Sequence, residues 1–393
     1  MKRLLWITLA VLGLLVAVSC QQGPAPAAER EIKLGIATPL SGPSAAWGTA
    51  HARALEMYLD EVNAAGGVEV AGAKYPIKII TYDHKYVIAD AVAAVNKLLS
   101  DDKVKFISLL GGSVVMALEE QLREAGVMGL HLAYAEGVVH PRNPLQFSYF
   151  AMPPETTRAW PWVKEKYPAI QNVATLTPND ETGWWSIKIS AKAAEAAGLK
   201  VVSREFFERP ATDFVPTLLR MLASKPDIID VTASPAGSVG LIVKQARELG
   251  YTGRFAHWGQ VNMAVVAKTA GEAGTEGFLA HGYVDAEFLP PAAKDWVDKY
   301  LKKYGPPFDP TTLDFCCGGH ALVAGLKAAG SREPAKVAEA LRTARFDTPW
   351  GKARYGGKEV YGIGNQIVYE LPISEYRGGK AVLVTTLPVF YKE

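Results

Sequence analysis

The sequence predicts an α/β protein with two lobes, each built on a mostly parallel sheet that is flanked by helices. Apolar strand segments alternate regularly with helix patterns, which is typical of parallel βαβ units. The alternation stops at an aromatic and proline-rich segment, 147–154, and then starts again. The 393 residues fit two domains better than one, and a hydrophobic content of 49% is enough for two large cores.

The first series of elements lies between residues 32 and 132. The strand expected at 32–37 is apolar on both faces, as is usual for a strand between two helical layers. The loop 39–44, Pro-Leu-Ser-Gly-Pro-Ser, leads into a long helix that ends at 64–67. Further strands are expected at 77–80, 104–110 and 127–132, and further helices at 89–99 and 114–124.

A second series follows the break at 147–154. Strands are expected at 173–176, 199–206 and 228–232, with shorter ones at 254–258 and 275–281. Helices are expected at 184–197, 214–223 and 239–249. A second complete series favours a second lobe over the continuation of one long sheet.

Two more helices, at 314–329 and 334–343, come after the second series. If they complete the first lobe, the chain crosses between the lobes more than once, as in proteins that close about a hinge of several strands. We therefore expect a first lobe of residues 31–150 and 285–346, and a second lobe of residues 151–284 and 347–393.

The N-terminus has the features of an export signal. Lys2 and Arg3 precede an uncharged apolar run, 4–18, that is too short to span a bilayer comfortably. The run ends in Ala-Val-Ser-Cys, which resembles a bacterial lipobox with Cys20 as the acylated residue. We expect a signal peptide at 1–19 and a lipidated tether at 20–30. The alternative is ordinary cleavage near Ala27, which would leave a soluble secreted protein.

Charge and motifs argue against several other classes of function. The formal charge is +2, and removal of Lys2 and Arg3 brings it to zero, so no basic surface favours nucleic acid. Phosphate-binding loops, zinc-ligand spacings and nucleophile motifs are not found in the sequence, so neither a cofactor, a metal nor catalysis is expected. Cys316 and Cys317 are adjacent, so we expect two small buried side chains rather than a disulfide.

Several motifs in order resemble one known family. These are the opening 32–43, Ile-Lys-Leu-Gly-Ile-Ala-Thr-Pro-Leu-Ser-Gly-Pro; the segment 60–67, Asp-Glu-Val-Asn-Ala-Ala-Gly-Gly; the helix 89–99; and the helix 239–250 of the second series. Together they resemble the leucine/isoleucine/valine-type periplasmic binding proteins, the receptors of ABC importers for branched-chain amino acids. The resemblance implies the two-lobed type I periplasmic-binding-protein fold, a small organic ligand in the cleft, and ABC permease subunits as partners.

The resemblance also implies where the ligand would bind. Gly112 and Ser113 begin a helix after a strand, where amide N–H groups and a hydroxyl suit a carboxylate; alternatively, Ser113 is only a helix cap. Trp47 would form an aromatic wall, although each aromatic residue taken singly is more often part of a core. The expected ligand-binding residues are Trp47, Gly112, Ser113, Ala133, Tyr134, Thr182, Trp184, Ser234, His257, Trp258 and Gln260.

This sequence departs from the amino-acid binders of the family at three positions. Ala135 stands where they have a threonine, Thr182 stands where they have a tyrosine, and the loop 255–261 lacks the acidic residue that binds the ligand ammonium. A buried ammonium without an anion is costly, so we expect a non-cationic organic acid or amide with a flat ring. Glu136 or Glu181 could still provide the anion, which leaves a leucine, isoleucine or valine binder as an alternative. A ligand sensor that signals to a partner protein is another.

Overall fold

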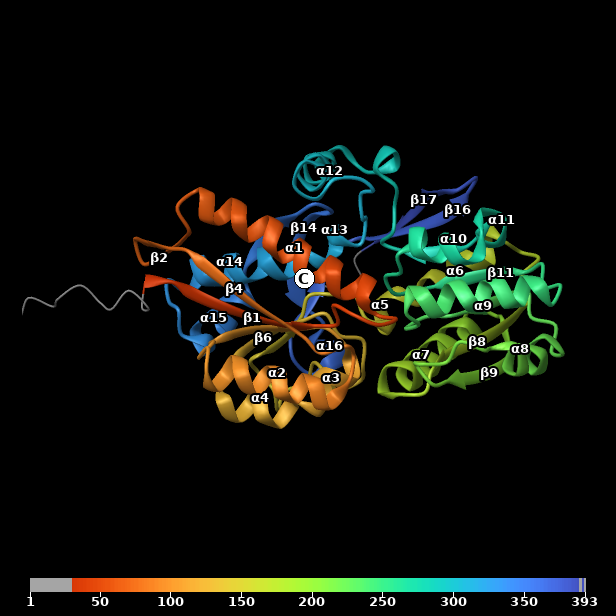
Figure 1. Ribbon diagram of the computed structural model, residues 1–393, viewed down its shortest axis with the longest axis horizontal. Coiled ribbons are helices and arrows are strands. Elements are labelled where there is room, and N and C mark those ends of the chain that lie inside the picture. Colours follow the sequence, from red (N-terminus) through yellow and green to blue (C-terminus); the bar gives the residue numbers. More distant parts are fainter. Residues whose placement is uncertain (1–29, 389–390, 392–393) are drawn as a thin grey trace, which may run out of the picture.

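The computed structural model describes residues 30–388 and 391. The expected signal peptide, Cys20 and nearly all of the expected tether lie outside these residues. The described chain forms two lobes side by side along the long axis of the molecule (Figure 1). Each lobe contains one large sheet with helices packed against it, which confirms the expected fold class. Among the described residues, no helix is both long enough and apolar enough to cross a bilayer.

The sheet of the first lobe has the strand order β13-β14-β15-β7-β6-β5-β1-β4. Strands β15, β7, β6, β5, β1 and β4 pair in parallel, whereas β13 and β14 pair antiparallel with their neighbours. The strands are β1 (Ile32–Thr38), β4 (Ile77–Asp83), β5 (Phe106–Leu109), β6 (Met128–His131), β7 (Gln146–Ser148), β13 (Arg345–Thr348), β14 (Gly351–Gly356) and β15 (Gln366–Val368). A small hairpin, β2 (Val68–Val70) and β3 (Ala73–Tyr75), was not expected.

The helices before β6 follow the expected pattern, with one difference. They are α1 (Ala45–Ala64), α2 (Ile88–Ser100), α3 (Gly112–Ala117) and α4 (Glu119–Ala125). The single helix expected at 114–124 is therefore two short helices that meet at Leu118. Helix α1 passes very close to the loop after β1: a Cβ on Gly48 would lie 1.8 Å from the carbonyl oxygen of Pro39. Glycine at this position lets the start of α1, with Trp47, pack against that loop.

The sheet of the second lobe has the strand order β17-β16-β12-β11-β10-β8-β9. Its strands are β8 (Asn172–Pro178), β9 (Lys200–Phe207), β10 (Ile228–Asp230), β11 (Arg254–His257), β12 (Leu279–His281), β16 (Leu371–Arg377) and β17 (Lys380–Leu387). Strands β9, β8, β10, β11 and β12 are parallel, and the β16–β17 hairpin adds antiparallel strands at one edge. The helices before β12 are α5 (Pro153–Thr156), α6 (Ala159–Lys166), α7 (Glu181–Ala196), α8 (Val215–Leu222), α9 (Ala236–Glu248), α10 (Met263–Ala270) and α11 (Glu272–Thr275).

The chain then returns to the first lobe, as the late helices suggested. After the 3-10 helix η2 (Ala286–Phe288) come α12 (Pro291–Tyr304), α13 (Thr312–Phe315), α14 (Cys317–Ala329) and α15 (Pro334–Leu341). Helices α12, α13 and α14 contact α1, and α15 packs on α14. Helix α16 (Lys358–Tyr361) lies between β14 and β15. Cys316 and Cys317 are buried and unbonded to each other, as expected.

The expected lobe boundary at residue 347 is wrong. Strand β13 spans it, and β14 and β15 continue the first sheet, where Gln366 pairs with Ser148 of β7. The last crossing to the second lobe therefore falls between Val368 and Leu371. The physical reason is that β7, which pairs with β6 on one side, would otherwise be an edge strand with the backbone hydrogen-bonding groups of its other side unsatisfied.

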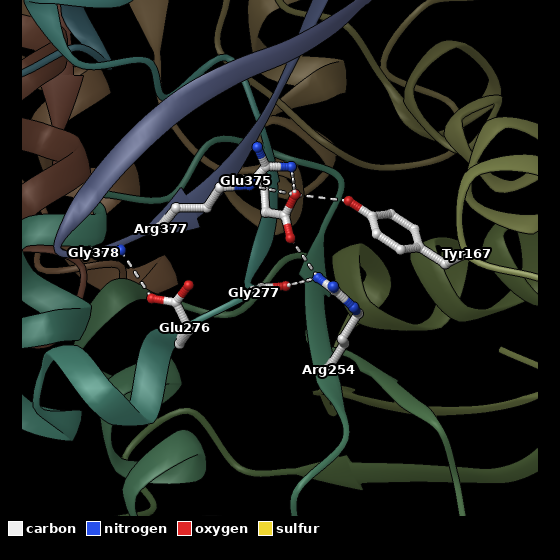
Figure 2. Close-up of polar contacts among 7 residues, drawn as sticks. All are labelled: Tyr167, Arg254, Glu276, Gly277, Glu375, Arg377 and Gly378. Atoms are coloured by element: carbon white, nitrogen blue, oxygen red, sulfur yellow. Dashed lines mark hydrogen bonds and ion pairs between the residues drawn. The ribbon is translucent and has the colours of Figure 1, made fainter. Parts of the chain in front are cut away.

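The hairpin β16–β17 is fastened to the second lobe by a network of ion pairs around Glu375 (Figure 2). The Glu375 carboxylate accepts hydrogen bonds from Arg254 Nη1 at 2.7 Å, from the Tyr167 hydroxyl at 2.7 Å and from Arg377 Nε at 2.9 Å. Burial alone would raise the pKa of Glu375, but these donors outweigh burial and lower it. In this network, which we call the Glu375 network, the buried charge is fully paired.

Candidate functional site

A cavity of about 40 Å³ lies where the two lobes meet. Its walls come largely from loops that follow the carboxyl ends of parallel strands in both sheets, which is where α/β proteins bind ligands. The lining residues are Trp47, Tyr86, Leu110, Gly111, Gly112, Leu132, Tyr134, Phe150, Thr182, Ala233, His257, Gly259, Gln260 and Phe315. Six of the expected binding residues are among them: Trp47, Gly112, Tyr134, Thr182, His257 and Gln260.

Trp47 joins the two lobes across the cavity. It lies in the first turn of α1, and its indole Nε1 donates a hydrogen bond to the backbone oxygen of Gln260 at 2.8 Å. Gln260 follows β11 of the second lobe, so this bond exists only when the lobes are close together. Trp47 is therefore both a wall of the cavity and a contact that closes it.

Gly112 lets the lobes approach each other. A Cβ at this position would lie 2.6 Å from the Ala135 Cβ and 2.7 Å from the Thr182 hydroxyl oxygen, so a larger residue would push the second lobe away. Ser113 is buried next to it, with its hydroxyl 3.5 Å from that of Thr182, but Ser113 itself is not a lining residue. The helix cap is Gly111, not Ser113, and α3 has only six residues, so its dipole is weak.

Tyr134 and His257 bring polar groups to the cavity from opposite lobes. The Tyr134 hydroxyl lies 2.7 Å from the hydroxyl of Thr156. His257 has Nδ1 at 2.8 Å from the Gly259 carbonyl oxygen and Nε2 at 3.1 Å from the Ser234 carbonyl oxygen. Burial lowers the pKa of His257 to about 4, although both carbonyls act in the other direction. The neutral ring therefore donates to only one carbonyl at a time.

Ala133 and Ser234 lie near the cavity but do not line it. Ala133 is buried in the core of the first lobe. The Ser234 hydroxyl is buried and lies 3.5 Å from the Leu176 carbonyl oxygen, so this residue contributes its backbone to His257 rather than its side chain to the cavity.

Trp184 and Trp258 do not lie on the cavity, contrary to expectation. Trp258 is fully buried and packs edge-on against Trp160, with ring centroids 5.2 Å apart. Trp184 is half exposed on the outer face of α7 and donates to Asn179 Oδ1 at 2.9 Å. Successive residues of a helix point in different directions, and the buried face of α7 carries Trp185 instead.

Several lining residues were missed because they reach the cavity from elsewhere in the fold. Leu110, Gly111, Leu132, Ala233 and Gly259 follow strand ends beside expected residues, so strand position was a usable signal. Phe150 comes from a crossing between the lobes and Phe315 from a returning helix, and no local pattern marks either of them.

Tyr86, another missed residue, links the lobes through Arg209. The Arg209 guanidinium of the second lobe lies over the Tyr86 ring, 4.2 Å from its centroid, and Arg209 Nε donates to Asp180 Oδ2 at 2.5 Å. Burial lowers the pKa of Arg209, but Tyr86 and Asp180 outweigh this effect and raise it. Arg209 therefore keeps its positive charge beside the Tyr86 and Thr182 part of the cavity.

No acidic side chain lines the cavity within the described residues. Glu136 is exposed and uses both carboxylate oxygens to bind Lys188, at 3.0 and 2.8 Å. Glu181 is exposed in the first turn of α7 and is not a lining residue. The same part of the chain holds no group of three or more His, Cys, Asp and Glu side chains that could bind a metal ion.

The chain is similar to known proteins over most of its length. The model of the family described as periplasmic binding protein matches residues 31–373. A leucine-, isoleucine-, valine-, threonine- and alanine-binding protein of Pseudomonas aeruginosa is 27% identical over 330 residues, which cover 83% of this chain and 86% of that one. The Leu/Ile/Val-binding protein homolog 8 of Brucella melitensis is 26% identical over 368 residues, which cover 86% of each chain.

Solved structures share the fold. A solute-binding protein of an ABC transporter from R. palustris, in complex with benzoate, has a TM-score of 0.78 at 22% identity and covers 92% of this chain and 98% of its own. A branched-chain amino acid transporter substrate-binding protein from Streptococcus pneumoniae, in complex with isoleucine, has a TM-score of 0.76 at 20% identity and covers 92% of this chain and 99% of its own. The chain therefore belongs to the periplasmic binding protein family, a family of extracytoplasmic solute-binding receptors.

Proposed function

We propose that this receptor binds a small, non-cationic organic acid with a planar apolar group and delivers it to the membrane subunits of an ABC importer. One observation supports this ligand class above the others: the cavity is walled by aromatic rings and has no acidic lining residue among those described. Trp47, Tyr86, Tyr134, Phe150 and Phe315 provide the rings. Aromatic pairs contribute about 1 kcal/mol beyond the burial of their area.

The same walls disfavour an amino acid. A ligand ammonium buried without an anion would lose its hydration and gain no counter-charge. Glu136 is occupied by Lys188, and Glu181 points to solvent, so neither supplies that charge at the cavity.

The ligand carboxylate would find its donors where Gly112, Ser113 and Thr182 meet. The hydroxyls of Ser113 and Thr182 lie 3.5 Å apart there, one from each lobe, and the amide N–H groups at the start of α3 are close by. Arg209, beside Tyr86, adds positive charge. A ligand held by both lobes shifts the population toward the closed form, which is the form that a membrane permease would recognise.

Leucine, isoleucine and valine remain the second candidate ligand class. The curated relatives at 26–27% identity have names that refer to these amino acids, and they match this chain over more than four fifths of its length. Sequence similarity therefore favours the branched-chain amino acids, whereas the composition of this cavity favours an aromatic acid.

A thermal-shift screen followed by calorimetry separates the two classes. The screen contains benzoate, two hydroxybenzoates, an aromatic amide, and leucine, isoleucine and valine. A ligand that binds the native state raises the melting temperature by mass action. We expect a shift with an aromatic acid and little or none with the amino acids. A shift with the three amino acids alone would reject the proposed ligand class.

We also propose that Cys20 carries the lipid anchor. The lipobox-like end of the apolar run supports this, and several acyl chains on one cysteine would hold the protein at a membrane. Cys20→Ala should move the protein from the membrane fraction to the soluble fraction and leave ligand affinity unchanged. Unaltered fractionation would reject the anchor.

Transport and sensing differ in one measurement. A strain without this receptor should lose uptake of the labelled ligand, and the gene supplied in trans should restore it. Unchanged uptake, together with a lost transcriptional response to the ligand, would favour the sensor.

A further inference from the structure

Behind the cavity wall lies a buried cluster of polar side chains without hydrogen-bond partners. It consists of Gln260, His281 and Asp314, and we call it the inner polar cluster. Gln260 follows β11, His281 ends β12, and Asp314 lies in α13. Each residue is at most 2% exposed. Within the described residues, both amide atoms of Gln260, both ring nitrogens of His281 and both carboxyl oxygens of Asp314 lack a partner.

Two of the three side chains, those of Gln260 and Asp314, meet beside Gly282. A Cβ on Gly282 would lie 1.9 Å from Gln260 Nε2 and 2.3 Å from Asp314 Oδ2, so these two atoms are within about 4.2 Å of each other. Gly282 has a φ of +71°, which also favours glycine. The backbone at this position therefore leaves room for two polar side chains to approach each other from different lobes.

The inner polar cluster borders the cavity directly. Gln260 belongs to both, and Phe315, the neighbour of Asp314, is a lining residue. Phe150, which also lines the cavity, has its ring centroid 6.1 Å from that of His281 and 6.0 Å from that of Phe315. An aromatic ring needs more room than the cavity's volume of about 40 Å³, so it would enter with the lobes further apart. A substituent on that ring would then have this cluster as its polar neighbour.

The three side chains are neutral at physiological pH. Burial raises the pKa of Asp314 to about 8, so its carboxyl group holds a proton. The indole N–H of Trp350 and the hydroxyl of Tyr369 act in the other direction, because they lie close to the carboxyl group although neither forms a well-aligned hydrogen bond with it. Burial lowers the pKa of His281 to about 3, and nearby His257 lowers it further. A protonated carboxyl, a neutral imidazole and an amide each have both donor and acceptor capacity. A hydroxyl group also donates and accepts, whereas an ammonium only donates and a carboxylate only accepts.

We propose that the inner polar cluster binds a neutral hydroxyl group of the ligand, so that a ring-bearing acid with a hydroxyl substituent is the preferred ligand. This inference rests on the proposed function and narrows its ligand class. Buried polar groups are normally paired, and unpaired ones next to a cavity are the groups that a ligand can satisfy.

The test compares benzoate with 3-hydroxybenzoate and 4-hydroxybenzoate by calorimetry. The wild-type protein should bind the better hydroxybenzoate about tenfold more tightly than benzoate, as one or two added hydrogen bonds allow. In Gln260→Leu and Asp314→Leu this ratio should fall to about one. Asp314→Asn, which stays neutral and polar, should keep most of the ratio. Gln245→Leu is the matched control, because Gln245 lies on α9 outside the cavity and its side chain is hydrogen-bonded to Phe214 N and Thr212 O. This variant should leave the ratio of affinities unchanged.

Each other outcome rejects the inference in a recognisable way. Equal binding of benzoate and both hydroxybenzoates, or a ratio that persists in the folded variants, overturns the hydroxyl site but leaves the ligand class standing. Binding of none of the three acids overturns both. Tight binding of leucine that disappears in Asp314→Asn would assign an ammonium to the cluster instead. Circular dichroism verifies folding, and Gln260→Leu decides the question if Asp314→Leu does not fold.

Discussion

Two buried clusters of polar groups in this molecule are built in opposite ways. In the Glu375 network, at the edge of the second sheet, the buried carboxylate accepts hydrogen bonds from Arg254, Tyr167 and Arg377 (Figure 2). In the inner polar cluster, the buried carboxyl of Asp314 has no well-aligned hydrogen bond within the described residues, although Trp350 and Tyr369 lie close enough to act on its pKa. The pKa of Glu375 is lowered, whereas that of Asp314 is raised to about 8.

The difference indicates which cluster serves stability. A buried polar group left unpaired costs about 1 to 3 kcal/mol, so a fold that keeps three such residues together is less stable than it would be without them. The Glu375 network holds the C-terminal hairpin on the sheet. The inner polar cluster lacks such hydrogen bonds and adjoins the cavity, which is the arrangement expected of a binding site.

The largest effect is expected at Glu375. Glu375→Gln should lower the free energy of unfolding by about 2 kcal/mol, because it leaves two arginines without their counter-charge; their partial exposure keeps the loss below that of a fully buried pair. Denaturant titration measures it. Glu276→Gln, which weakens only one exposed hydrogen bond to Gly378, is the control and should cost less than about 1 kcal/mol. Equal losses in the two variants would show that the network is not a structural unit.

The pH dependence of this effect has a definite sign. The pKa of Glu375 is lower in the folded state than in the unfolded state, so its contribution is complete above the unfolded pKa and is lost as the pH falls through the folded pKa. The difference in stability between wild type and Glu375→Gln should therefore shrink on acidification below pH 4.

A substitution of Asp314 is expected to change the stability in the opposite direction. Asp314→Leu should stabilise the ligand-free protein by about 1 kcal/mol, because it replaces an unpaired buried carboxyl with an apolar side chain of similar size. The folded-state pKa is raised, so wild-type stability should fall as the pH rises from about 4 to about 8, and Asp314→Asn should lack this decrease. Measurement of unfolding at pH 5 and pH 8 tests both statements. Destabilisation by Asp314→Leu would mean that the cluster serves the fold after all.

A moderate effect on ligand affinity is expected at Trp47. Trp47→Phe keeps an aromatic wall but removes the hydrogen bond to the Gln260 backbone that joins the closed lobes. Affinity should fall about fivefold, the equivalent of about 1 kcal/mol. Trp184→Phe is the matched control, since the half-exposed Trp184 lies outside the cavity, and it should leave affinity within twofold. A larger loss in Trp184→Phe than in Trp47→Phe would contradict the cavity described here.

The smallest effect is expected at His257. Burial lowers its pKa to about 4, so the folded state prefers the neutral ring. Its contribution to stability is present above the unfolded pKa of about 6.5 and is lost as the pH falls toward 4. His257→Gln should therefore flatten the fall in melting temperature between pH 6.5 and 4. An unchanged slope would show that the ring charges freely.

Periodicity in the sequence predicted most of the elements that form the two sheets, because strands such as β1 and helices such as α2 have local patterns that tertiary contacts reinforce. The predicted boundary at 347 was wrong, because β15 belongs to the first sheet through its pairing partner β7, more than two hundred residues earlier, and β14 pairs with β15. Local sequence does not encode that partner.

The residues that line the cavity could be predicted only in part, because some are marked by local sequence and others are brought there by the overall fold. Gly112, Thr182 and His257 follow strand ends, and strand ends meet in a parallel sheet, so their position was a usable signal. Phe150, Phe315 and Asp314 come from crossings and returning helices, where position depends on the whole fold. Trp184 and Trp258 were predicted to line the cavity but do not. Both follow strand ends, yet the direction of a side chain depends on the local backbone conformation, which a position in the sequence does not reveal.

Calorimetry of the wild-type protein with benzoate, 4-hydroxybenzoate and leucine decides whether this cleft selects a non-cationic, ring-bearing acid over an amino acid. We expect 4-hydroxybenzoate or benzoate to bind at least tenfold more tightly than leucine, because the rings of the wall offer stacking and the described lining offers no anion for an ammonium. Leucine binding more tightly than both acids, and losing that affinity in Glu181→Gln or Asp314→Asn, would contradict the claim and make the receptor an amino-acid binder.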